Sequence, residues 1–176
     1  MPGSVRIVGC GRSSLGDDRA GLVVAERLLG LGMPDTVVTG DEVPGAAFMM
    51  EQDKDVGLLI VVDAAPADDS RPAGSFARID YRQHPDMLGA RSQGSTHTLD
   101  VEVGLRLADS LGALPGQVWI YVIFGTQFDR GLELTPAVEN GIAPFVERIA
   151  ADVRSWRKGN TPSAGGWAGH RPDISR

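Results

Sequence analysis

The sequence predicts an α/β protein of three layers, in which helices cover both faces of a mostly parallel, twisted sheet. Short apolar runs of strand length alternate along the chain with longer segments whose apolar residues recur at three- and four-residue steps. The most apolar runs are continuous rather than alternating, which is typical of strands buried on both faces. The resulting β-α-β-α order favours a mostly parallel sheet between two helical layers.

Length and composition indicate one globular domain. The chain has 176 residues, of which 42% are hydrophobic and 23% charged, enough to bury one core. A formal charge of -6 and the lack of a Lys/Arg cluster argue against a nucleic-acid partner. The sequence contains neither an apolar stretch of ~20 residues nor the pattern of a signal peptide. We therefore expect a cytoplasmic protein with no membrane partner.

The single cysteine limits the kinds of site that the chain can build. Cys10 alone cannot form an internal disulfide framework or a zinc site made of several thiolates. Any metal ion must therefore be held by carboxylates and histidines.

The N-terminal segment predicts a strand, a tight turn and a helix. Residues 5–9 form a short apolar run, and a Gly-x-Gly turn follows at 9–11. From Asp18 onward the apolar spacing is helical, and Gly30 and Gly32 mark the end of the helix. The residues that carry this spacing are Ala20, Val23, Val24, Leu28 and Leu31.

The middle of the chain predicts three more strands. Residues 35–40 form a short one, and residues 44–52 a brief helical segment after it. Residues 56–65 are the most apolar run and predict a central strand. Residues 75–81 alternate in polarity after a Pro/Gly turn, which predicts a strand that lies at an edge or pairs antiparallel.

The C-terminal half predicts two helices around a central strand. A four-residue spacing predicts a helix over 98–111, and the apolar run at 117–125 predicts the strand. Residues 136–158 have helical spacing, and Pro144 is expected to kink this helix or to start a second one. The four-residue spacing in the first helix comes from Leu99, Val103, Leu107 and Leu111.

The last residues differ in composition from the rest. Residues 159–176 are rich in Gly, Pro and Ser and show no periodicity. We expect them to form a flexible tail after a single domain at residues 1–158.

Three positions are candidates for chemistry because they follow predicted strands or precede a helix at the expected functional edge. Asp17 and Asp18 come after the first strand, Asp63 ends the apolar run that starts at residue 56, and His97 precedes the helix at 98–111. The carboxyl ends of parallel strands meet at one edge of a sheet, where α/β proteins bind ligands. Two carboxylates and an imidazole at that edge would suit a divalent metal ion.

Each of these residues also has a purely structural interpretation. Asp17 and Asp18 can cap the following helix and complement its dipole. Asp63 can accept hydrogen bonds from loop amides, and His97 can cap a helix start.

Other common site patterns are weak or missing. The turn at 9–11 lacks the third glycine of a dinucleotide fingerprint, and neither a Walker motif nor a G-x-S-x-G elbow occurs. Cys10, inside the tight turn, is more typical of a small buried residue than of a nucleophile.

From about residue 5 to about residue 152, the sequence resembles the hydrogenase maturation protease family. In that family an acid pair opens the first helix, an acid ends the buried strand and a histidine precedes a later helix; the matching positions are Asp18, Asp63 and His97. The G-L-E-L-T-P segment at 131–136 is a further similarity, expected to shape the rim after the last strand. The segments that carry the resemblance are VRIVGCGRSSLGDDRAGLVVAERL, LLIVVDAAPA, GSTHTLDVEVGLRLADSLGALPGQVWIYVIFG and FDRGLELTPAVENGIAPFVERI.

The resemblance implies an endopeptidase that removes the C-terminal extension of a nickel-iron hydrogenase large-subunit precursor. The nickel arrives with the precursor, and Asp18, Asp63 and His97 are implied as the catalytic and metal-binding residues. Three protein ligands would leave positions for substrate and water. Asp17 is implied either as support for this site or as a helix cap, and we favour the cap.

Two departures from the family pattern bear on substrate choice. Arg12 stands where the family usually has Asn, and the segment after the last strand reads FGTQFDRG at 124–131.

Two other functions are alternatives to the endopeptidase: an assembly chaperone that binds the precursor without cutting it, and a small-molecule hydrolase on a similar sheet. The hydrolase should show a phosphate- or base-binding set, which the sequence lacks.

Overall fold

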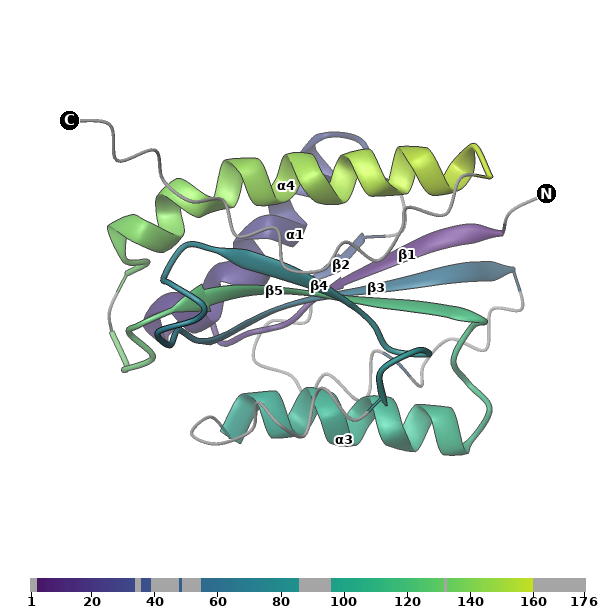
Figure 1. Ribbon diagram of the computed structural model, residues 1–176, viewed down its shortest axis with the longest axis horizontal. Helices are drawn as coiled ribbons and strands as arrows, with labels where there is room; N and C mark the ends of the chain where they lie inside the picture. The colour runs from purple at the N-terminus through teal and green to yellow at the C-terminus, as the bar shows by residue number, and fades with distance from the viewer. Residues whose placement is uncertain are drawn as a thin grey trace.

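Five strands form one sheet in the order β2-β1-β3-β5-β4 (Figure 1). The computed structural model describes residues 3–33, 36–38, 48, 55–85, 96–131 and 133–159. The first four strands of that order run parallel, and β4 pairs antiparallel with β5 at one edge. The predicted α/β class and the antiparallel edge strand are confirmed. The strands are β1 (Ser4–Gly9), β2 (Thr36–Val38), β3 (Val56–Pro66), β4 (Phe76–Asp80) and β5 (Gln117–Gly125).

Helices cover both faces of the sheet, as Figure 1 shows. A 3₁₀ turn, η1 (Gly16–Arg19), leads into α1 (Ala20–Gly30), which packs with α4 (Pro136–Arg157) on one face. The opposite face is covered by α3 (Thr96–Ser110). None of the described helices combines the length and the hydrophobicity needed to cross a membrane.

Two apolar cores result from the two-residue period of the strands. In β3, Leu58, Ile60 and Val62 are buried against α1 and α4, whereas Leu59 and Val61 are buried in the core under α3. This explains why the run is continuously apolar, since each face of β3 has its own helical layer to contact.

Helix α3 buries a different side from the one its four-residue spacing marks. Among the α3 side chains that the structure describes, the buried apolar ones are Val101, Leu105 and Ala108. The spacing residues Val103, Leu107 and Leu111 are 61%, 45% and 62% exposed. A repeat of four residues identifies a helix, but it does not fix which side of the helix meets the core.

Helix α4 continues through Pro144, so of the two alternatives expected there, a kink or the start of a second helix, the second does not occur. Proline removes one backbone hydrogen bond, here to the carbonyl of Asn140. Both residues are exposed, so water can bond that carbonyl. The buried face of the helix, which includes Phe145 and Ile149, offsets the remaining cost.

Two sequence predictions fall on residues that the structure does not describe. Of the expected helical segment at 44–52, only Phe48 is described, and it is helical. The expected tail at 159–176 lies outside the described residues except for Gly159, and it stays a prediction.

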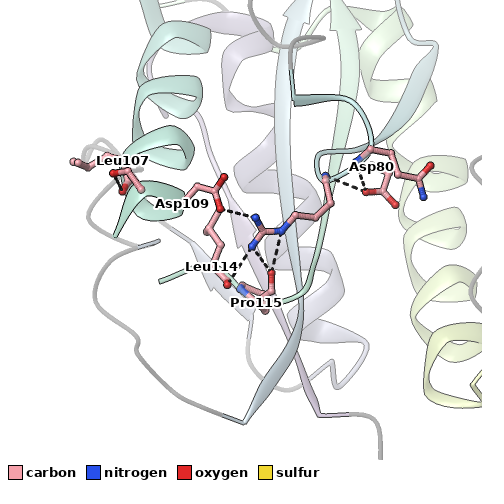
Figure 2. A network of polar contacts seen from close by, with 8 residues as sticks. Asp80, Leu107, Asp109, Leu114 and Pro115 are labelled. Atoms are coloured by element: carbon pink, nitrogen blue, oxygen red, sulfur yellow. Dashed lines mark hydrogen bonds and ion pairs between the residues drawn. The ribbon is translucent and has the colours of Figure 1, made fainter. Parts of the chain in front are cut away.

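A polar network fastens the C-terminal end of α3 to the loop after β4 (Figure 2). The Arg82 guanidinium donates to the Asp109 carboxylate and to the carbonyls of Leu114 and Pro115. In turn, Asp80 accepts from the Arg82 amide at 3.1 Å. Since β5 begins just after this point, the network lies at the amino edge of the parallel strands, and the first turn of α3 lies toward the carboxyl edge.

Candidate functional site

The carboxyl edge of the sheet is stepped. Strand β1 ends at Gly9, which pairs with Val62, while β3 continues beside β5 as far as Pro66. The amide of Cys10 still donates to the Val62 carbonyl at 2.8 Å. Asp63 is therefore the first β3 residue beyond the end of β1, rather than the end of its own strand as the sequence suggested.

Asp18 reaches this step from the 3₁₀ turn η1. Its side chain is buried, at 2% exposure, and its Oδ2 atom accepts a hydrogen bond from the Arg12 amide at 3.1 Å. Gly11 makes this approach possible. Its φ of 143° lies in the region that favours glycine, and a Cβ there would lie 2.1 Å from the Asp18 carbonyl oxygen. The Gly-x-Gly turn thus folds closely over a carboxylate-bearing segment.

Asp63 is also buried, at 4% exposure, and it interacts electrostatically with Asp18. Burial, and to a lesser extent the charge of the neighbouring Asp18, together raise the pKa of Asp63 to about 8, although a backbone hydrogen bond involving Ala64 acts in the opposite direction. Asp63 is therefore mostly protonated at neutral pH unless a cation joins the pair.

Cys10 lies within the field of the same two carboxylates. Burial, then the charges of Asp63 and Asp18, raises the pKa of its thiol well above the ordinary value. The thiol stays protonated at neutral pH, which does not suit a nucleophile. This agrees with the sequence interpretation of Cys10 as a small buried residue.

The structure brings Asp18 and Asp63 together, but it describes only the backbone of His97. This residue is second in α3 and lies in its first turn, not before the helix as expected; its side chain is outside the described residues. Within the side chains that are described, no three His, Cys, Asp or Glu residues form a group that could hold a metal ion.

Asp17 does not cap α1, so the favoured interpretation of this residue is wrong. Neither η1 nor α1 has a side-chain cap hydrogen bond. The Asp17 carboxylate instead accepts hydrogen bonds from the loop between β5 and α4, at Thr126, Gln127 and Thr135. In a 3₁₀ turn adjacent side chains project about 120° apart, which allows neighbouring acids to serve different segments.

The loop after β5 contributes residues whose contact with Asp17 the sequence did not predict. Thr126, Gln127 and Thr135 contact Asp17, and the Gly131 amide donates to the Ser14 carbonyl at 2.8 Å. Two segments noted in the sequence cover this region, FGTQFDRG at 124–131 and G-L-E-L-T-P at 131–136, but neither pattern indicates a contact with Asp17. Its described residues lie on the same edge of the sheet as Asp63.

Comparison with known sequences identifies a family for this chain. Residues 39–152 match a family model described as hydrogenase maturation protease, and the match includes Asp63 and His97. A putative hydrogenase maturation protease from Methanocaldococcus jannaschii is 35% identical over 85 residues, or 47% of this chain. That similarity spans 54% of the relative, about half of its length.

Solved structures of similar fold cover most of the chain. The hydrogenase maturating endopeptidase HybD from Escherichia coli superposes with a TM-score of 0.72 at 20% identity, covering 87% of this chain and 93% of that one. HybD from Thermococcus kodakarensis, a nickel-iron hydrogenase maturation protease, gives 0.70 at 22% identity, covering 84% and 97%. At these identities the similarity concerns the fold alone, and it extends over most of this chain and nearly all of each of the two relatives.

Proposed function

This chain belongs to the hydrogenase maturation protease family, and we propose that it is an endopeptidase that removes the C-terminal extension of a nickel-loaded hydrogenase large-subunit precursor. The observation that carries the proposal is the pair of buried carboxyl groups, Asp18 and Asp63, at the carboxyl edge of the sheet. Their position matches the place where open α/β sheets bind ligands.

The electrostatics of the pair favour a divalent cation. Burial and the charge of Asp18 hold a proton on Asp63 at neutral pH. A divalent ion between the two groups would replace that proton, because its charge offsets both the desolvation and the mutual repulsion of the carboxylates. Carboxylate oxygen is a ligand type that divalent transition metals accept.

His97 is the third proposed ligand, and the backbone supports it. Asp63 is an odd-numbered β3 residue, like Leu59 and Val61 in the core under α3, and the first turn of α3 lies toward the same edge. Position 97 precedes the buried Val101 by four residues, so the two positions share one side of the helix. The sheet edge, the face of the sheet and the position in the helix are therefore all consistent with His97 as a ligand beside Asp63.

In this proposal nickel belongs to the substrate. The precursor presents its ion to Asp18, Asp63 and His97, and three protein ligands leave coordination positions for the precursor and for water. An ion so held would act as a Lewis acid beside the scissile bond, by polarising its carbonyl or by lowering the pKa of a bound water. Recognition and cleavage would then depend on the same ion, which would limit cutting to precursors that already carry nickel.

The test is incubation of the full chain with nickel-loaded and with nickel-free precursor, followed by intact mass of the precursor. We expect the loaded precursor to lose its C-terminal extension and the nickel-free one to stay intact. Equal cleavage of both would contradict recognition through nickel. A loaded precursor that binds but remains uncut at high enzyme concentration would indicate the chaperone instead.

A further inference from the structure

We propose that Asp17 is a positioning residue that locks the loop after β5 to the turn that carries Asp18. We call this loop, residues 126–131 and 133–135, the rim loop. The inference rests on the proposed function, because it assigns the rim loop a fixed position relative to a proposed metal ligand. Asp17 itself need not contact the substrate for this role.

The Asp17 carboxylate is saturated by donors from both ends of the rim loop. Its Oδ2 atom accepts from the amides of Thr126 at 2.8 Å and Gln127 at 3.1 Å, directly after β5. Its Oδ1 atom accepts from the Thr135 amide at 2.7 Å, at the start of α4, and the Thr135 hydroxyl lies 3.0 Å from both oxygens. In return, the Asp17 amide donates to the Gln127 carbonyl at 2.6 Å. One side chain thus joins the end of a strand, the start of a helix and the turn η1.

The packing around this carboxylate is tight. Asp17 is fully buried. A Cβ on Gly125, the last residue of β5, would lie 2.6 Å from the Asp17 Cβ and 2.7 Å from its Oδ2 atom. Only glycine at this position lets the strand end approach the carboxylate, so backbone shape and hydrogen bonds select the same contact.

Thr135 uses its side chain for the contact with Asp17 and not to cap α4. It is the N-cap residue of α4, yet its side chain makes no capping hydrogen bond. A threonine at this position ordinarily bonds an amide of the first helical turn. Here the hydroxyl is directed to Asp17. The negative carboxylate also lies beside the positive end of the α4 dipole.

The geometry transmits this fixation to Asp18. Asp17 and Asp18 are consecutive in a short 3₁₀ turn, so one planar peptide unit links them. A second tie joins the rim loop to the same segment, from the Gly131 amide to the Ser14 carbonyl. The Arg12 amide, which donates to Asp18 Oδ2, reports on the position of the Asp18 carboxylate. A change that loosens the rim loop at Thr135 should therefore weaken the hydrogen bond from the Arg12 amide to Asp18.

The experiment removes the contact between Asp17 and the rim loop by changing its partner Thr135. In Thr135→Val the hydroxyl is lost while size and β-branching are kept, and Thr135→Ser restores the hydroxyl. Thr36→Val is the matched control, because it removes another hydroxyl contact, 3.0 Å to the Met33 carbonyl in a loop before β2. Asp17→Asn is the direct variant. Readouts are cleavage kinetics of the nickel-loaded precursor and amide exchange by NMR at Arg12, with β5 amides as the internal reference.

We expect Thr135→Val to lower kcat/KM by about tenfold, the size of effect that a lost hydrogen bond to a charged group produces. Exchange at Arg12 should accelerate relative to β5, Thr135→Ser should restore both values, and Thr36→Val should change neither. Asp17→Asn should show the larger effect, because an amide nitrogen would face backbone N–H donors.

The outcomes separate this inference from the proposed function. Unchanged kcat/KM in Thr135→Val, or exchange that rises equally in β5 and at Arg12, would overturn the positioning role even if the wild-type chain cuts the precursor. If the wild-type chain does not cut it, the proposed function fails, and the Arg12 exchange alone decides whether Asp17 couples the rim loop to Asp18. Should Asp17→Asn not fold, Thr135→Val carries the test.

Discussion

At the scale of single residues, burial and charge act in the same direction on Asp63. Desolvation disfavours its ionised form, and the neighbouring Asp18 adds like-charge repulsion, so the pKa of Asp63 rises to about 8. A carboxyl group in this position lowers stability when it ionises. Its presence in the core therefore favours a functional reason over a structural one.

This argument predicts how stability depends on pH. An unfolded aspartate has a pKa of about 3.9, so between pH about 4 and about 8 the folded chain holds a proton on Asp63 that the unfolded chain has lost. The unfolding free energy should then fall with rising pH, by up to about 1.4 kcal/mol per unit from this group. The stabilising contribution is complete below the unfolded pKa and is lost as the pH rises through about 8.

Asp63→Asn should flatten this decline and make the variant more stable than the wild type at pH 8. Asp18→Asn, which removes the like charge, should shift the end of the decline to lower pH. Denaturant unfolding of the metal-free chain from pH 5 to 9 measures both effects. A wild-type slope in Asp63→Asn would show that another group causes the decline.

The same residues should be essential for cleavage. Removing support around a metal ligand typically costs 10–100-fold, so Asp18→Asn, Asp63→Asn and His97→Ala should each lower kcat on nickel-loaded precursor by ~100-fold or more. Asp69→Asn, an exposed carboxylate close to Asp63 in sequence, is the matched control and should retain activity. Full activity in His97→Ala would remove the imidazole from the proposed ligand set.

At the scale of elements, sequence patterns predicted those features that depend on neighbouring residues. The apolar run of β3 and the alternating run of β4 each report their own burial, so the strands and the antiparallel edge could be predicted. The Asp18 and Asp63 sites followed from the rule that strand ends meet at one edge. The role of Asp17 could not be predicted from local patterns, because its partner Thr135 is 118 residues away in the sequence. The buried side of α3 likewise depends on how the helix is placed on the sheet.

A buried polar network joins α4 to the sheet and should contribute to stability alone. Asp152 on α4 accepts hydrogen bonds from the Tyr121 hydroxyl at 2.7 Å and from Arg148 Nε at 2.9 Å, and it pairs with Arg78 at 3.5 Å. Burial raises the pKa of Tyr121 well above its ordinary value, so its hydroxyl remains a donor.

Tyr121→Phe should lower the unfolding free energy by ~1–2 kcal/mol, the net value of a hydrogen bond to a charged group. Asp152→Ala should cost more, ~3–5 kcal/mol, because it removes the carboxylate partner of the buried Arg78 guanidinium. Urea unfolding measures both values. Since the network lies away from the carboxyl edge, Tyr121→Phe should cleave precursor as the wild type does, and a large loss of kcat would contradict this separation.

At the scale of the whole molecule, the two edges of the sheet are built differently. Arg82 and its backbone partners fasten the amino edge, where α3 ends (Figure 2). At the carboxyl edge, Asp17 fastens the rim loop, and burial together with the charge of the neighbouring Asp18 disfavours the ionised form of Asp63. A binding site of this kind needs rigid surroundings. The two carboxyl groups then stay close together, and an incoming cation relieves the repulsion between them.

This division predicts that a divalent ion should stabilise the folded chain as a whole. An ion that binds only the folded state at 100 times its Kd adds about 2.7 kcal/mol of stability. Because Asp63, with a pKa of about 8, must lose its proton to bind the ion, the gain in Tm with excess Ni²⁺ should be larger at pH 8 than at pH 6. Asp18→Asn and Asp63→Asn should lose this gain, and Asp69→Asn should keep it. Thermal unfolding with and without Ni²⁺ at the two pH values measures the effect, and an equal gain in Asp63→Asn would place the ion elsewhere on the protein.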